Sequence, residues 1–93
     1  MLDEKVLGKK YCQELQEVID IRVDRRKIYG DSFLDESPES ILAIIDGKRN
    51  RFNAINKNDD LSQEQLNKSL DELRDIVNYY VFYICQYKYH HSK

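Results

Sequence analysis

The sequence predicts an all-α protein with three main helices packed as an antiparallel bundle. Only three Gly and one Pro occur in 93 residues, so few positions interrupt a helix. Charged residues make up 34% of the chain, and Leu, Ile, Glu and Lys are used heavily, which favours helices over strands. No internal repeat or low-complexity segment divides the chain, so we expect a single helical domain over residues 1–93, with frayed ends at 1–2 and 90–93.

The first helix is expected from about Asp3 to Ile28. Asp3 is a suitable N-cap because its side chain can accept a hydrogen bond from a free backbone N–H group. At the other end, residues 29–32 read Tyr-Gly-Asp-Ser, and Gly30 can adopt the left-handed conformation that stops a helix. The following loop runs through Asp35 and Glu36.

The second helix is expected to begin with Ser37 as N-cap and Pro38 at its first position, and to fade by Asn56. Proline is favoured there because its missing N–H group would have no partner in any case. The third helix opens with Ser62 and Gln65, which match a capping box. It can continue to about Tyr89, which leaves residues 90–93 as a frayed tail.

Size and charge limit the classes of partner. A chain of 93 residues buries about 60–65% of its unfolded surface and is only modestly stable alone, so we expect a homodimer or a larger homo-oligomer to complete the bundle. With 15 basic and 17 acidic residues, the chain is nearly balanced, so overall electrostatics do not favour nucleic acid or an anionic membrane.

The cysteines and the apolar segments predict a cytoplasmic protein. Cys12 and Cys85 could form at most one bridge, and we see no signal peptide, so both are expected to be reduced thiols. The most apolar run, residues 76–87, is only 12 residues long and contains Asn78 and Gln86. It is too short to span a bilayer.

Two pairs of acidic residues point to a metal site. Glu14 and Glu17 are three residues apart on the first helix, and Glu72 and Asp75 are three apart on the third. Side chains at this spacing are neighbours, and like charges repel there, so a bound cation would explain the pairs. Mg2+ prefers carboxylate oxygens. The alternative is that both pairs lie on solvated helix faces.

Charged residues also interrupt the apolar stripes of the first two helices. Glu14 projects near the middle of the first stripe, which comprises Leu7, Tyr11, Val18 and Ile21. Lys48 lies within the second stripe and Arg51 borders it; this stripe comprises Ile41, Ile44, Ile45, Phe52 and Ile55. An unpaired buried charge costs several kcal/mol. Glu14 and Lys48 are therefore expected to pair with each other, to bind a metal, or to face a polar cavity, and Lys48 could instead extend its ammonium to the rim.

The third helix carries its main apolar stripe on one side and a second apolar patch on the other. The main stripe comprises Leu66, Leu70, Leu73, Val77, Tyr80, Val81 and Ile84. Tyr79, Phe82 and Cys85 form the patch on the opposite side. A helix that is apolar all round is buried on more than one side, so its C-terminal half is expected to meet a second subunit, unless the tyrosines coat a monomer surface.

Three motifs in order resemble a known family. They are residues 29–32 (YGDS), 46–51 (DGKRNR) and 71–79 (DELRDIVNY). Together with the paired acids they resemble the MazG-like all-α nucleoside triphosphate pyrophosphohydrolases, and more closely the nucleotide modification associated domain 1 family of bacteria and phages. The resemblance covers roughly residues 11–85 and implies a MazG-like helical fold.

The resemblance also implies a function. Glu14, Glu17, Glu72 and Asp75 match Mg2+ ligands, and Lys48 and Arg51 match phosphate-binding residues. The implied reaction is Mg2+-dependent cleavage of a nucleotide between its α and β phosphates, with Glu14 or Glu17 orienting the attacking water. Tyr29 and Tyr79 are candidates for stacking on the base.

Two departures from the family pattern keep other functions open. Gln13 stands where an acid often precedes the first motif, and an additional helix lengthens the stretch between Glu17 and Glu72. The chain could therefore be a nucleotide-binding sensor or sequestering module without hydrolytic activity. It could also be a purely structural helical dimer in which the acids form surface ion pairs.

Overall fold

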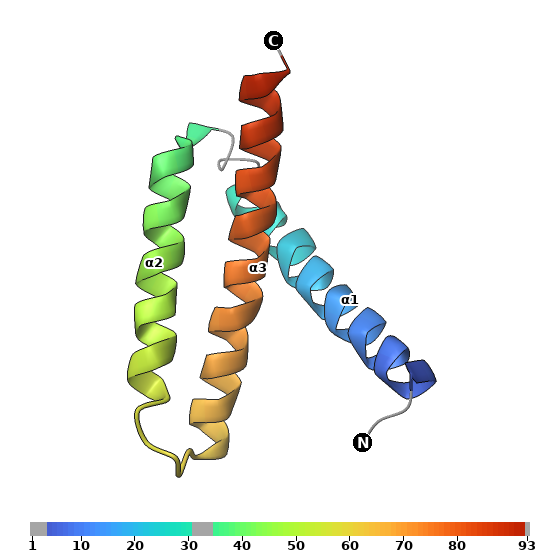
Figure 1. Ribbon diagram of the computed structural model, residues 1–93, viewed down its shortest axis with the longest axis vertical. Helices are drawn as coiled ribbons and strands as arrows, with labels where there is room; N and C mark the ends of the chain where they lie inside the picture. Colours follow the sequence, from blue (N-terminus) through green and yellow to red (C-terminus); the bar gives the residue numbers. More distant parts are fainter. Residues whose placement is uncertain (1–3, 31–34, 93) are drawn as a thin grey trace. The chain divides into compact units, whose positions relative to one another are not determined.

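The computed structural model describes residues 4–30, apart from the side chain of Tyr29, and residues 35–92. Over these residues the regular structure is entirely helical, with α1 at Glu4–Tyr29, α2 at Pro38–Ile55 and α3 at Gln63–His91 (Figure 1). The all-α prediction with three helices is confirmed. None of the helices in this part of the chain is long and apolar enough to cross a membrane. The predicted cap Asp3 and the loop residues Asp31 and Ser32 lie outside the described residues.

The chain divides into two compact units, the first containing α1 and ending at Gly30, the second containing α2 and α3. Gly30 has a φ of 61°, and its N–H group donates to the carbonyl of Arg26 at 2.8 Å. This left-handed residue ends α1 as predicted, because only glycine adopts that conformation without a steric penalty. A bundle that includes all three helices stays a prediction.

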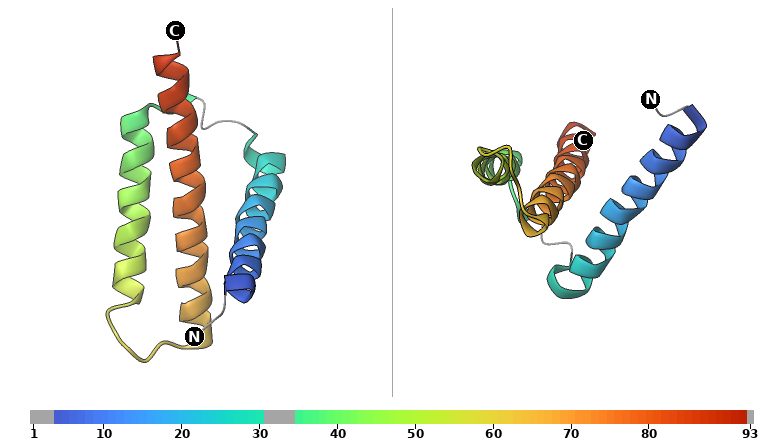
Figure 2. Two further views of the ribbon diagram at one scale, coloured as in Figure 1. Left: turned by 45° about the vertical axis from the view of Figure 1, so that its right-hand side comes forward. Right: turned by 90° about the horizontal axis from the view of Figure 1, so that it is seen from below.

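In the second unit, α2 and α3 lie side by side and run in opposite directions (Figures 1 and 2). Ser37 caps α2, because its Oγ accepts a hydrogen bond from the N–H group of Ser40 at 3.1 Å. Ser62 and Gln65 form the predicted capping box: the N–H group of Gln65 donates to Ser62 Oγ at 3.2 Å, and that of Ser62 donates to Gln65 Oε1 at 2.9 Å. Local hydrogen bonds thus fix both helix starts.

The far end of α3 differs from the prediction. The helix continues through His91, with Ser92 as its C-cap, so the predicted end at Tyr89 falls two residues short and His90 and His91 are helical. Lys88, His90 and His91 lie in the last turn, where positive charge interacts favourably with the helix dipole. Lys93 lies outside the described residues.

The apolar core of this unit centres on α2. Ile41 and Ile45 are fully buried, and Ile44, Phe52 and Ile55 are half-buried. The predicted stripe of the second helix is therefore the face that packs on α3. Two isoleucines of this kind contribute about 1.5–3 kcal/mol each by leaving water, a modest core that makes the polar contacts around it important.

On α3, the most buried residues on the side that meets α2 are polar, whereas the main apolar stripe is not in that interface. Ser69, Asp75 and Gln86 are buried, while the apolar stripe residues from Leu66 to Ile84 are 41–52% exposed. At 100° per residue the two sides are about 140° apart around the helix. The packing of α2 thus follows the polar flank of α3, and α2 leaves uncovered the stripe that looks most like a core face.

Candidate functional site

The centre of the α2–α3 interface is an ion-pair cluster around Lys48. Its Nζ lies 3.1 Å from Oδ2 of Asp75 and 4.0 Å from Oε2 of Glu72. The three side chains are only 12%, 10% and 18% exposed, respectively. Lys48 therefore places its positive charge between the two carboxylates predicted as metal ligands on α3, and its hydrogen bond to Asp75 is charge-assisted.

Glu72 lies within ion-pair distance of two basic side chains of α2, Lys48 and Arg51. Its Oε1 is 3.7 Å from Nη1 of Arg51, a distance too long for a hydrogen bond. Its Oε2 is buried and has no hydrogen-bond partner among the described residues. A buried carboxylate oxygen without a donor lowers the stability of the fold. This atom is therefore a candidate ligand for a cation or for a hydrogen-bond donor that binds from outside.

Tyr79 completes the cluster. The ammonium of Lys48 lies 5.5 Å from the centre of the Tyr79 ring, within the range of a cation–π interaction. The ring of Phe82 meets that of Tyr79 edge-on, with centroids 5.3 Å apart. Tyr79 therefore lies against the lysine of α2, and its stacking on a nucleotide base stays a prediction.

Helical spacing explains why these residues meet. Glu72, Asp75 and Tyr79 are three and four residues apart on α3, and Lys48 and Arg51 are three apart on α2, so each set lies along one face of its helix. Of the eight residues predicted for the site, the structure brings together these five. Tyr29 lies at the end of α1, and its side chain is outside the described part of the chain.

Two further polar contacts hold the same interface, and the sequence analysis missed both. Nδ2 of Asn56 donates to Ser69 Oγ at 2.9 Å and to the Phe52 carbonyl at 2.8 Å. Nε2 of Gln86 donates to the Glu36 carbonyl at 3.1 Å. Periodicity could have indicated Ser69 and Gln86, because both share a helix face with Glu72 and Tyr79.

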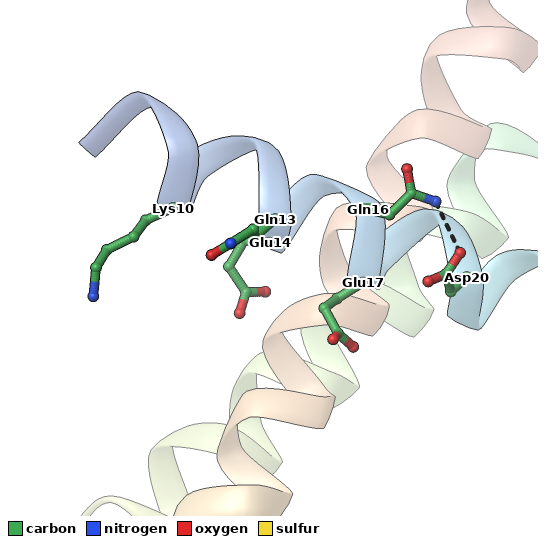
Figure 3. Close-up of a pocket in the computed structure, with 6 residues that line it drawn as sticks. All are labelled: Lys10, Gln13, Glu14, Gln16, Glu17 and Asp20. Atoms are coloured by element: carbon green, nitrogen blue, oxygen red, sulfur yellow. Dashed lines mark hydrogen bonds between the residues drawn. The ribbon is translucent and has the colours of Figure 1, made fainter. Parts of the chain in front are cut away.

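Glu14 and Glu17, the other predicted metal ligands, lie together on α1. They line a surface hollow with four more residues of that helix: Lys10, Gln13, Gln16 and Asp20 (Figure 3). The carboxylates of Glu14 and Glu17 point to the same side of the helix (Figure 3), and Nε2 of Gln16 donates to Asp20 Oδ1 at 2.9 Å. Gln13 also lines this hollow. At the position where the family pattern often has an acid, this chain therefore presents an amide.

Neither unit alone contains a complete metal site. Among the described residues, no group of three or more His, Cys, Asp or Glu side chains could hold a metal ion. Each unit supplies one pair of carboxylates: Glu14 and Glu17 from α1, and Glu72 and Asp75 from α3. Convergence of the two pairs therefore stays a prediction.

Comparison of the chain with protein-family models, curated proteins and solved structures finds no match. The resemblance to MazG-like proteins therefore depends on the three motifs and the paired acids alone. Two of them, residues 46–51 and 71–79, supply all five members of the Lys48 cluster.

Proposed function

We propose that this chain is a MazG-like nucleotide pyrophosphohydrolase that depends on Mg2+. The observation that carries the proposal is Oε2 of Glu72, a buried carboxylate oxygen without a hydrogen-bond donor among the described residues, next to Asp75 and two basic side chains. Burying the carboxylate of Glu72 next to that of Asp75 lowers the stability of the fold. A divalent cation would give both carboxylates a close partner.

The residues of the cluster fit such a cation. Two carboxylates face two positive charges, from Lys48 and Arg51, so the cluster is neutral as it stands. Arg51 is 66% exposed, so its side chain can reorient toward a ligand while α2 and α3 stay packed. Once Arg51 binds a phosphate, its charge no longer balances the cluster. Lys48, Glu72 and Asp75 then carry a net negative charge, which favours the binding of Mg2+.

The ligands of the metal would be Glu72 and Asp75 of α3 and Glu14 and Glu17 of α1. When bound, Mg2+ would polarise the phosphate oxygens and activate a water molecule. Glu14 or Glu17 would orient that water and accept its proton. Lys48 and Arg51 would bind the phosphates and offset the charge that develops on the leaving pyrophosphate, and Tyr29 remains a candidate for stacking on the base.

The proposal is tested with a thermal-shift screen of nucleoside triphosphates with and without Mg2+, followed by a pyrophosphate-release assay on any nucleotide that stabilises the chain. Glu72→Gln keeps the shape of the side chain and removes its charge, so we expect it to abolish Mg2+-dependent turnover. Asp71→Asn is the matched control, since Asp71 is exposed and pairs only loosely with Arg74 at 3.9 Å. Unchanged turnover in Glu72→Gln would remove the metal-ligand role, and no turnover by the native chain would exclude the hydrolase.

A second function, binding without hydrolysis, is favoured by Gln13. An amide among Glu14, Glu17 and Asp20 lowers the negative charge available for a metal, while Lys48 and Arg51 would still bind phosphate. A nucleotide-binding sensor or sequestering module would show a calorimetric binding signal without pyrophosphate release. A purely structural dimer would show neither binding nor a thermal shift.

A further inference from the structure

The exposed stripe of α3 has the spacing of a coiled-coil seam. It consists of six apolar residues separated alternately by four and three positions: Leu66, Leu70, Leu73, Val77, Tyr80 and Ile84. We call this set the α3 seam. Each residue is 41–52% exposed, although α2 packs on the same helix. Apolar residues with this alternation mark the line along which two helices wrap around each other.

The residue types at the two kinds of seam position differ. Leu70, Val77 and Ile84 occupy one set, the a positions of a heptad, and two of these three are β-branched. Leu66, Leu73 and Tyr80 occupy the other set, the d positions. β-Branched residues at a with leucine at d favour two parallel strands over three or four.

We propose that the α3 seam pairs with the α3 seam of a second copy as a parallel, two-stranded coiled coil. This inference is independent of the proposed nucleotide chemistry. In a parallel pair each g position meets the following e position of the other helix. Ile76 would then meet Val81, and Tyr83 would meet Lys88, so one flanking pair is apolar and the other joins a phenol to an ammonium. No like charges oppose each other at these two contacts.

The amount of exposed apolar surface is sufficient for a dimer. The six side chains, each exposed by two-fifths or more, together have on the order of 500 Å2 of accessible surface per copy. A dimer would therefore bury on the order of 1,000 Å2, which reaches the lower limit for specific interfaces. An apolar patch of this size equals the largest patch on a typical monomer, about 300–600 Å2, and such patches are often interaction sites.

A second copy of α3 suits the seam because the two facing sets of side chains are both apolar, so pairing them buries no charge. The α3 seam has no charged residue at any of its six positions.

The first experiment measures molar mass by sedimentation equilibrium on the full chain. We expect a dimer for the native chain and, for Leu73→Asp, a dissociation constant raised about 100-fold or more, because two carboxylates would face each other in an apolar seam. Leu15→Asp is the matched control, since Leu15 on α1 is 44% exposed and Leu73 is 41% exposed. It should leave the mass unchanged. A monomeric native chain, or dissociation caused by Leu15→Asp, would overturn the proposal.

Disulfide crosslinking keeps the proposal testable should Leu73→Asp fail to fold. In a Cys12→Ala/Cys85→Ala background, Leu73→Cys and Tyr80→Cys should each form a disulfide dimer on mild oxidation, because like d positions face each other in a parallel pair within bonding distance. Asp71→Cys, on the far side of the helix, should not. Absence of both seam crosslinks in a chain of dimeric mass would exclude the parallel seam.

Discussion

The Nζ of Lys48 lies 3.1 Å from Oδ2 of Asp75 across the interface of α2 and α3, with both side chains close to nine-tenths buried. This pair, rather than the apolar stripe of α3, lies at the centre of the contact between the two helices. The ammonium also lies 4.0 Å from Glu72 and 5.5 Å from the Tyr79 ring centre, so one cation links three residues of α3. The stability of the unit and its proposed chemistry therefore depend on the same side chain.

Replacing Lys48 by Met should strongly destabilise the chain. The substitution keeps the length of the side chain but leaves Asp75 and Glu72 buried without the ammonium, and breaking a buried ion pair in this way costs about 3–5 kcal/mol. We expect the midpoint of urea unfolding, followed by circular dichroism, to fall accordingly.

Arg49→Met is the control for Lys48→Met. Arg49 pairs with Asp46 on the surface at 3.8 Å, with both side chains more than 60% exposed, and such pairs contribute about 0–1 kcal/mol. Adding Asp75→Leu to Lys48→Met should restore part of the lost stability, because both charges are then removed. Equal unfolding midpoints for Lys48→Met and Arg49→Met would show that the buried pair contributes little.

Lys48→Met should also separate metal binding from phosphate binding. If Glu72 and Asp75 are Mg2+ ligands, Lys48→Met removes the ammonium that competes with the metal, so Mg2+ alone should raise the thermal midpoint of the variant more than that of the native chain. Nucleotide binding should weaken at the same time, because a phosphate-binding residue is lost. Equal Mg2+ responses in the two proteins would contradict the assignment of these carboxylates as ligands.

The capping box at the start of α3 gives a prediction that does not depend on function. Ser62→Ala removes the oxygen that accepts from the N–H group of Gln65, and the loss of such a cap costs about 1 kcal/mol. For a chain of this size that corresponds to a fall of about 4–8 °C in Tm. Ser62→Asp retains an acceptor and should stay close to the native Tm; an equal fall in both variants would show that the cap is not the cause.

The sequence predicted the features of the fold that neighbouring residues determine. Ser37 with Pro38, Ser62 with Gln65, and Gly30 each act within one helical turn, so their effects do not depend on the rest of the chain. The helix boundaries at these positions agree with the structure to within a residue. The exception is the end of α3, where no glycine or proline stops the helix and it continues to His91.

The partners of each helix face could not be predicted in this way. Periodicity identifies an apolar face, but it does not say which segment covers it. Lys48 could have paired with Glu14, bound a ligand or reached the rim, and only the three-dimensional contact selects Asp75, which is 27 residues away. The α2–α3 interface uses the polar flank of α3 because Lys48 and Asn56 of the α2 side find charged or polar partners there, and composition does not reveal such pairs.

The hydrogen bond between Gln86 and Glu36 gives the last prediction. Gln86 is only 3% exposed, and its Nε2 donates to the carbonyl of Glu36, the residue before the cap of α2. Gln86→Leu keeps a similar volume but removes the donor, so we expect a loss of about 0.5–1.5 kcal/mol, the usual net contribution of one hydrogen bond. Gln63→Leu is the control, because Gln63 bonds Asn67 on the surface of the same helix at 3.1 Å. If urea unfolds both variants at the same midpoint, the Gln86 bond does not stabilise the start of α2, and the Ser37 cap alone must hold it.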